Sequence, residues 1–168
     1  MAPENATDPE LLSLVEGALE AHNFPPERLI LEISQRVFTG NEEAIGVQCA
    51  RLRKLGIRIA IDDFGTSYFS LAALKILPVD QLKIDQSLVV PIPSNETDRR
   101  VVGAVIQLAH AVNLEVVAEG IEDGDIMQAL LAIGCEIGEG FHFSQPIPAD
   151  EFESEWISKF SNDRVETA

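Results

Sequence analysis

Residues 57–66 read IRIAIDDFGT, an apolar run followed by two aspartates and a glycine turn. The β-branched isoleucines form a short run without helical spacing, which predicts a buried strand over 57–61. Asp62 and Asp63 come directly after it, before the turn that Gly65 indicates. This stretch is therefore predicted to be a buried strand that ends in charged residues.

The same unit recurs, separated by helical patterns. Strands are predicted at 29–33, 81–85, 115–119 and about 136–143. Apolar residues spaced three and four apart predict helices over 11–19, 41–55, 70–76, 98–112 and 125–133, and a last helix capped by Asp150 with Phe152, Trp156 and Phe160 on one face. Helical crossovers between strands imply parallel pairing, and hence an α/β fold.

Five predicted strands leave two architectures open. A closed (β/α)8 barrel needs eight strands and typically about 250 residues. The chain would therefore form either an open doubly wound sheet or a barrel that lacks part of its wall. The hydrophobic periodicity of the sequence does not distinguish these two architectures.

Local signals set the expected element boundaries. Asp8-Pro9 and Asn41 are predicted to begin the first two helices, and Asp98 the long fourth one. The expected buried stripe of that long helix consists of Val101, Val102, Val105, Leu108 and Val112. Residues 91–97 are expected to form a loop, and residues 1–7 and 162–168 to be flexible tails of a single domain.

Composition limits the class of protein. A net charge of −16, from 12 basic and 28 acidic residues, argues against polymeric nucleic acid and anionic membranes as main partners. No apolar run approaches the roughly 20 residues of a membrane span. Cys49 and Cys135 lie far apart and are predicted to be buried thiols in a reducing compartment. The cytoplasm is the expected location.

Charged side chains recur at the carboxyl ends of the predicted strands: Glu32, Asp62, Asp63, Lys83, Asp85, Glu119, Glu122 and Glu139. These strand ends meet at one rim of a parallel α/β fold, where several carboxylates repel one another. A divalent cation relieves that repulsion, and oxygen ligands favour Mg²⁺ or Mn²⁺. Lys83 could then orient a water molecule or stabilise developing negative charge. The pattern indicates a metal-assisted reaction at a phosphate ester.

Taken singly, most of these residues have a structural explanation. Glu32 or Glu139 alone would be a solvated strand end, and Lys83 with Asp85 a structural ion pair. Taken together, charges on five separate strands favour a site. The histidines have no ligand spacing and are interpreted as packed or surface residues: His22, His110 and His142.

Several motifs occur in an order and spacing that resemble the EAL domain family: LEISQ at 31–35, DDFGTSY at 62–68, LKID at 82–85 and AEGIE at 118–122. Gly134-Cys135, Gly140-Phe141 and Pro146 extend the similarity. The resemblance implies an incomplete TIM-type (β/α) barrel. It also implies hydrolysis of cyclic di-GMP to linear pGpG with Mg²⁺ or Mn²⁺.

The resemblance also implies roles for individual residues. Metal contacts fall to Glu32, Asp62, Asp63 and Glu119, with Asp62 bridging two metal ions. Lys83 would lie against the attacking water and Glu122 would brace the site. Residues 63–68, including Gly65, Thr66 and Ser67, would form a mobile loop that orders the metals and contributes to dimerisation. Asp85 and Glu139 are further candidates at the substrate and loop.

The sequence departs from the family at several points. No Glu-Ala-Leu occurs, and the family's hairpin and following strand, which carry a glutamate and an asparagine ligand, have no match. Gln35 stands where the family has the second glutamate of Glu-x-x-Glu, Glu139 where it has glutamine, and Ser67 where it has glycine. Missing ligands predict a poorly held metal and inefficient hydrolysis. Missing strands predict an open barrel edge that a second copy or a partner chain could cover.

Three hypotheses follow. The chain is an EAL phosphodiesterase domain; or it is a non-catalytic EAL-like module that binds protein partners, or nucleotide weakly; or it is a fragment without a function of its own. Formation of pGpG from cyclic di-GMP with Mn²⁺ separates the first from the others.

Overall fold

The computed structural model describes residues 6, 8–38, 41–67, 69 and 71–154. The predictions for Trp156, Phe160 and residues 162–168 lie outside these ranges. Of residues 1–7 only Ala6 is described, and its side chain is buried. In the described part of the chain, no helix is long and apolar enough to cross a membrane.

One sheet of five parallel strands organises the molecule. Their order is β1 (Ile30–Ser34), β2 (Arg58–Phe64), β3 (Gln81–Ile84), β4 (Glu115–Ala118) and β5 (Ile137–Gly138). Spatial order equals chain order, so every crossover moves one strand in the same direction. A doubly wound sheet reverses direction once, whereas a (β/α) barrel does not. The incomplete TIM-type barrel is therefore confirmed, and β1 and β5 are the two edges of the described sheet.

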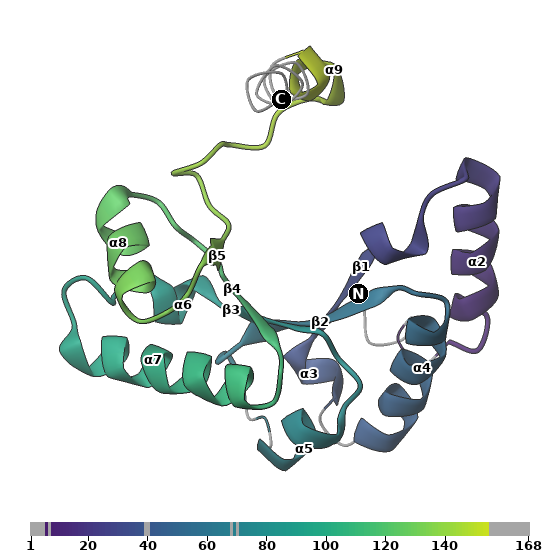
Figure 1. Ribbon diagram of the computed structural model, residues 1–168, viewed down its shortest axis with the longest axis horizontal. Coiled ribbons are helices and arrows are strands. Elements are labelled where there is room, and N and C mark those ends of the chain that lie inside the picture. Colours follow the sequence, from purple (N-terminus) through teal and green to yellow (C-terminus); the bar gives the residue numbers. More distant parts are fainter. Residues whose placement is uncertain (1–5, 7, 39–40, 68, 70, 155–168) are drawn as a thin grey trace, which may run out of the picture.

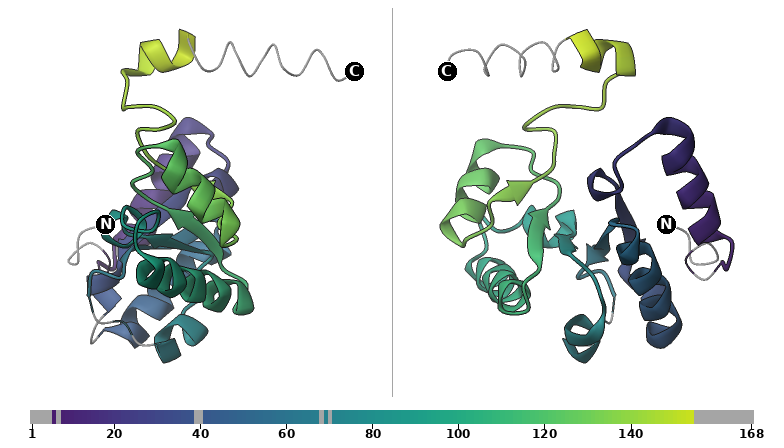
Figure 2. Two further views of the ribbon diagram at one scale, coloured as in Figure 1. Left: turned by 90° about the vertical axis from the view of Figure 1, so that its left-hand side faces the viewer. Right: turned by 45° about the vertical axis from the view of Figure 1, so that its right-hand side comes forward.

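Helices cover the convex side of this curved sheet (Figure 1; Figure 2). They are α2 (Leu11–His22), the 3-10 turn η1 (Pro26–Arg28), α3 (Gln35–Phe38), α4 (Glu42–Lys54), α5 (Leu71–Ile76), α6 (Gln86–Val89), α7 (Glu96–Ala111) and α8 (Gly124–Ala132). A further helix, α9 (Ala149–Phe152), does not cover the sheet. After β5 the chain leaves the body of the molecule and α9 stands apart from the sheet in every view.

The apolar core lies between the sheet and these helices. Strand residues alternate between the two faces of a sheet, so every second side chain of each strand enters the core. Fully buried members from the two central strands are Ile59, Ile61, Leu82 and Ile84. Helix α4 adds Ile45, Cys49 and Leu52, and α7 adds Val102, Ile106 and Ala109. Both cysteines are buried free thiols, as predicted, and burial raises the pKa of Cys49 to about 11.

Two predicted features of α7 are wrong. The helix begins at Glu96 rather than Asp98, because the Asn95 side chain accepts hydrogen bonds from the Thr97 and Asp98 N–H groups. Val101 is 47% exposed and does not belong to the buried stripe, whereas Val102 is buried and Val105, Leu108 and Val112 pack against the core as predicted. The most deeply buried residues of the helix are Val102, Ile106 and Ala109. Because Val101 and Val102 are neighbours in the sequence, the hydrophobic pattern did not show which of the two faces the sheet.

The last predicted strand is also wrong in extent. Only Ile137–Gly138 pair with β4, instead of residues 136–143. Beyond them the backbone turns around Ile121: Ile121 N–H donates to Glu139 O and His142 N–H donates to Ile121 O. Phe141 and Phe143 are consequently exposed rather than stacked in a sheet.

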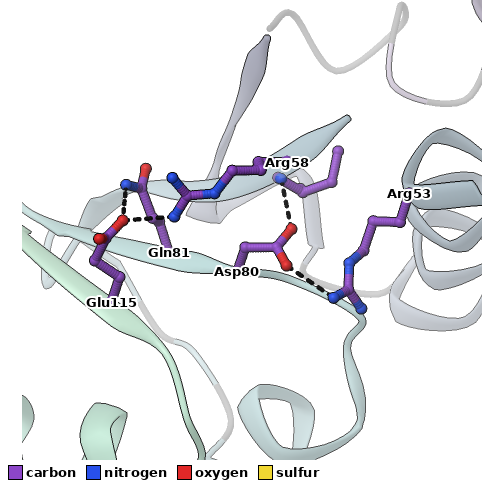
Figure 3. A network of polar contacts seen from close by, with 6 residues as sticks. Arg53, Arg58, Asp80, Gln81 and Glu115 are labelled. Carbon is purple, nitrogen blue, oxygen red and sulfur yellow. Dashed lines mark hydrogen bonds and ion pairs between the residues drawn. The ribbon is translucent and has the colours of Figure 1, made fainter. Parts of the chain in front are cut away.

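A polar network joins the amino-terminal ends of the central strands (Figure 3). Gln81 and Arg58 both donate to the Glu115 carboxylate and hold its pKa below its ordinary value. Next to them, Asp80 accepts from the Ile59 N–H at 2.9 Å and pairs with Arg53 at 2.8 Å. The Asp80 N–H donates in turn to Ile59 O at 2.8 Å, so Asp80 fixes the β2–β3 register through backbone groups.

Replacing Asp80 by alanine is expected to lower the free energy of unfolding by about 2 kcal/mol, because the buried Ile59 N–H loses its acceptor. The Arg53→Ala control removes a partner that is 42% exposed and is expected to cost less than about 1 kcal/mol. Urea unfolding monitored by circular dichroism measures both. Equal losses in the two variants would contradict the backbone role of Asp80.

Candidate functional site

The concave face of the sheet carries acidic groups around one buried lysine. Lys83, in the middle of β3, is 4% exposed. Its Nζ lies 2.7 Å from Glu32 Oε1 on β1 and 2.7 Å from Glu119 Oε1, which follows β4. Glu139, which follows β5, places its Oε2 3.3 Å from the same nitrogen. Strand alternation and parallel order thus bring acidic groups from three other strands to a single ammonium.

The electrostatics of this cluster follow from burial and ion pairing. Burial by itself lowers the pKa of Lys83, but hydrogen bonds to Glu119 and Glu32 outweigh it and raise the pKa above its ordinary value. Burial raises the pKa of Asp62 and of Glu119, and Lys83 opposes the rise in both. One ammonium therefore stabilises several carboxylates that have lost part of their hydration, a setting in which further positive charge is favourable.

A β-bulge places the two aspartates. Between Ile61 and Phe64 strand β2 advances three residues, while β3 advances only from Leu82 to Ile84. The extra residue lies at Asp62-Asp63, and Asp63 takes a left-handed φ of 57°. Its N–H donates to Asp62 Oδ1 at 2.9 Å, and Asp63 Oδ2 accepts from Ser34 Oγ at 2.8 Å. The bulge therefore allows two consecutive carboxylates to lie at the rim formed by the carboxyl ends of the strands.

The turn after the bulge is fixed by its backbone. Thr66 N–H and Oγ1 both donate to Asp63 O, at 3.2 and 3.0 Å. Gly65 has φ +106°, and an added Cβ would lie 2.2 Å from Leu88 Cδ1. Left-handed conformations thus fall on Asp63 and Gly65 and not on Ser67, so the serine at position 67 fits this turn.

Gln35 is a residue whose role sequence reasoning missed. It is 1% exposed and lies in α3, directly after β1. Its Nε2 donates to Ser67 O at 2.5 Å and to Ser67 Oγ at 3.1 Å, while its Oε1 accepts from Gly65 N–H at 2.8 Å. The uncharged amide supplies both a donor and an acceptor, which a carboxylate does not. Gln35 and Ser67 both depart from the family pattern, and this joint departure was the signal in the sequence that could have indicated their contact.

Replacing Gln35 by methionine is expected to lower the free energy of unfolding by about 2–3 kcal/mol, because Gly65 N–H and Ser67 O lose their partners. Gln48 is a matched control, since it is also buried and its Nε2 makes one 3.2 Å bond to Asp8 O. Gln48→Met is expected to cost about 1 kcal/mol. Limited proteolysis at residues 64–67 gives a second readout, and only Gln35→Met is expected to accelerate it.

Asp85 and Glu122 do not join the Lys83 cluster directly. Asp85 caps α6, where its Oδ1 accepts from Ser87 N–H at 2.9 Å. Glu122 is exposed and lines a small hollow of about 210 Å³ beside the cluster. The other lining residues are Gln86, Glu119, Gly120, Glu139, Gly140 and Phe141. A larger apolar hollow of about 710 Å³ lies along residues 140–152 and contains none of the predicted site carboxylates.

The donor set fits a hard divalent cation, since it consists of carboxylate oxygens with reduced hydration. In the described ranges, however, no three His, Cys, Asp or Glu side chains are arranged to hold a metal ion together. The Lys83 ammonium instead contacts an oxygen of Glu32 and an oxygen of Glu119.

A single family accounts for the order of the motifs, for the incomplete barrel in which strand order equals chain order, and for the carboxylates around Lys83. The EAL domain model matches residues 1–146. This chain belongs to the EAL domain family. Phosphodiesterases of this family are generally dependent on divalent metal ions.

Solved EAL structures resemble it closely. The EAL domain of Mycobacterium smegmatis DcpA is 37% identical, with a TM-score of 0.88 over 94% of this chain and 71% of that one. The PaMucR phosphodiesterase in complex with c-di-GMP is 34% identical, with a TM-score of 0.86 over 90% of this chain and 62% of that one.

Curated relatives are much longer than this chain. The bifunctional diguanylate cyclase/cyclic di-GMP phosphodiesterase MucR of Pseudomonas aeruginosa is 36% identical over 141 residues, 84% of this chain and 21% of MucR. The signaling protein YkoW of Bacillus subtilis is 38% identical over 144 residues, 86% of this chain and 18% of YkoW. The chain thus spans about a fifth of the length of such relatives.

Proposed function

We propose that this chain is a cyclic-di-GMP phosphodiesterase domain, which hydrolyses one phosphodiester bond of cyclic di-GMP to give pGpG. The observation that carries the proposal is the meeting of Glu32 and Glu119, from separate strands, at 2.7 Å from Lys83 Nζ. Relatives named as cyclic di-GMP phosphodiesterases support it, as does the likeness to the PaMucR complex with c-di-GMP.

Four carboxylates are the proposed ligands of Mg²⁺ or Mn²⁺: Glu32, Asp62, Asp63 and Glu119. Bound divalent cations neutralise phosphate oxygens and lower the pKa of water. Asp62 and Asp63 are held for this task by the bulge, by Ser34 and by the turn that Gln35 braces. The Lys83 ammonium supplies fixed positive charge beside the phosphate and orients the attacking water.

The remaining candidates act around this centre. Glu122, in the hollow next to Glu119, braces the site from the substrate side. The turn of Gly65, Thr66 and Ser67 would help to order bound metal ions, and Asp85 would support it from the cap of α6. Glu139 lies against Lys83 and faces the same hollow.

Partners and location are part of the same proposal. The ligand is cyclic di-GMP or its product pGpG, not a nucleic acid polymer. A homodimer or a partner chain covers the open sheet edges, since β1 and β5 each present one unpaired side in the described sheet. The domain works in the cytoplasm, in keeping with the free buried thiols of Cys49 and Cys135.

A second candidate function is a non-catalytic module that binds nucleotide or a protein partner. The third carboxylate on Lys83, from Glu139, favours it, because it adds negative charge toward a phosphate ligand. For the 168-residue chain we therefore expect slow turnover.

Incubation of the full chain with cyclic di-GMP and Mn²⁺, followed by chromatography for pGpG, tests the proposal. Slow formation of pGpG that EDTA stops and added Mn²⁺ restores is the expected result. Saturable binding of cyclic di-GMP by calorimetry without turnover would favour the module. Neither turnover nor binding would overturn both the phosphodiesterase and the nucleotide-binding module, and would leave only the binding of a protein partner.

A further inference from the structure

Lys83 occupies a central position among the acidic groups of the site. Its ammonium takes one oxygen from Glu32 and one from Glu119, each at 2.7 Å. Both residues belong to the set proposed above for a divalent cation. The ammonium and the cation therefore draw on the same two carboxylates.

The two positive charges compete. Mg²⁺ binds carboxylate oxygens at about 2.0–2.1 Å, so a cation held by Glu32 and Glu119 would stand within a few ångströms of Lys83 Nζ. At such separations like charges repel strongly in a partly desolvated site. The ammonium has to give up at least part of its contact with these two carboxylates when the cation binds.

Glu139 offers the ammonium an alternative contact. Its carboxylate is 3.3 Å from Lys83 Nζ, is 58% exposed and lies outside the proposed ligand set. It follows β5, at the edge of the sheet, whereas Asp62 lies on the opposite side of β3 from β4 and β5. We propose that Glu139 is a positioning residue that retains the Lys83 ammonium in the site when Glu32 and Glu119 bind a divalent cation. This inference rests on the proposed metal-dependent function.

The charge of Glu139 is essential to this role. A glutamine at position 139 would offer Lys83 a neutral acceptor and no compensation of charge. In that variant the ammonium would hold Glu32 and Glu119 more persistently, and the cation would bind less tightly. Removal of the ammonium itself would have the opposite effect.

Calorimetric titration of the full chain with Mn²⁺ alone tests the proposal. The variants are Glu139→Gln, Lys83→Met and the double variant, with Glu136→Gln as the charge-matched control. Glu136 is exposed and precedes β5, at the other end of that strand. Lys83→Gln replaces Lys83→Met if the latter does not fold, as judged by circular dichroism.

The expected pattern is a coupling between the two positions. Lys83→Met is expected to tighten Mn²⁺ binding about tenfold, since a competing charge is removed. Glu139→Gln is expected to weaken it about tenfold when Lys83 is present, and only about twofold in the Lys83→Met background. Glu136→Gln is expected to leave the affinity unchanged.

Other outcomes are decisive against it. If Glu139→Gln weakens binding by the same factor in both backgrounds, Glu139 acts by charge alone and the positioning role is overturned. If Lys83→Met does not tighten binding, the competition is overturned. In both cases Mn²⁺ binding by the unaltered chain would leave the proposed function standing, whereas absence of that binding would overturn both.

Discussion

Replacement of Asp62 by asparagine is expected to weaken Mn²⁺ binding about a hundredfold and to abolish formation of pGpG. The change removes a charged ligand from the bulge while keeping its size and a carbonyl oxygen. That oxygen can still accept the Asp63 N–H bond that Asp62 Oδ1 accepts at 2.9 Å. The loss would therefore be one of charge at the metal rather than of structure.

The thermal stability of the Asp62→Asn variant, in contrast, is not expected to fall. Burial raises the pKa of Asp62, so the folded chain holds this proton more tightly than the unfolded chain does. The ionised carboxylate consequently costs stability as pH rises through its raised pKa, and the asparagine lacks that cost. Asp62→Asn is expected to unfold at the same or a higher temperature at pH 7, by differential scanning calorimetry.

Asp125→Asn is the matched control. Asp125 is exposed in the first turn of α8, and its replacement is expected to change neither Mn²⁺ binding nor turnover. An Asp62→Asn variant that retains Mn²⁺ affinity, or that loses it only together with its fold, would contradict the assignment of Asp62 as a ligand.

Replacement of Gly140 by alanine is expected to lower the free energy of unfolding by about 3 kcal/mol. An added Cβ would lie 2.1 Å from Ile121 O, 2.4 Å from Ile121 N and 2.6 Å from Ile121 C, all backbone atoms that no side-chain rotation can move away. Relief requires residues 139–142 to shift, which breaks their hydrogen bonds to Ile121. In a domain of this size the melting temperature would fall by about 6–12 °C.

Gly17→Ala is the control, because Gly17 lies in α2 and an added Cβ there meets nothing within 4 Å. Alanine is the better helix former, so this variant is expected to gain up to about 1 kcal/mol. Calorimetry measures both variants. If Gly140→Ala melted no lower than the unaltered chain, the close passage of residues 139–142 over Ile121 would be wrong.

Much of the fold could be predicted from local sequence. Residues 57–61 contain three β-branched isoleucines and are bounded by a glycine and two aspartates, so their assignment as a strand needed no neighbours. The end of β5 could not be predicted in this way. Phe141 and Phe143 alternate like strand residues, yet the strand ends at Gly138, because the following backbone turns around Ile121 and bonds to it instead of extending the ladder with β4.

The candidate site shows the same division. The sequence alone indicated that Glu32, Asp62 and Glu119 lie on or directly after predicted strands, because each follows a run of three apolar residues. Only the tertiary structure decided that Glu32, Glu119 and Glu139 all contact Lys83, that Asp62 and Asp63 lie in a bulge, and that Gln35 holds the turn. The physical reason is the separation along the chain. Hydrophobic alternation is a pattern among neighbouring residues, whereas each of these contacts depends on the register between strands that are distant in sequence.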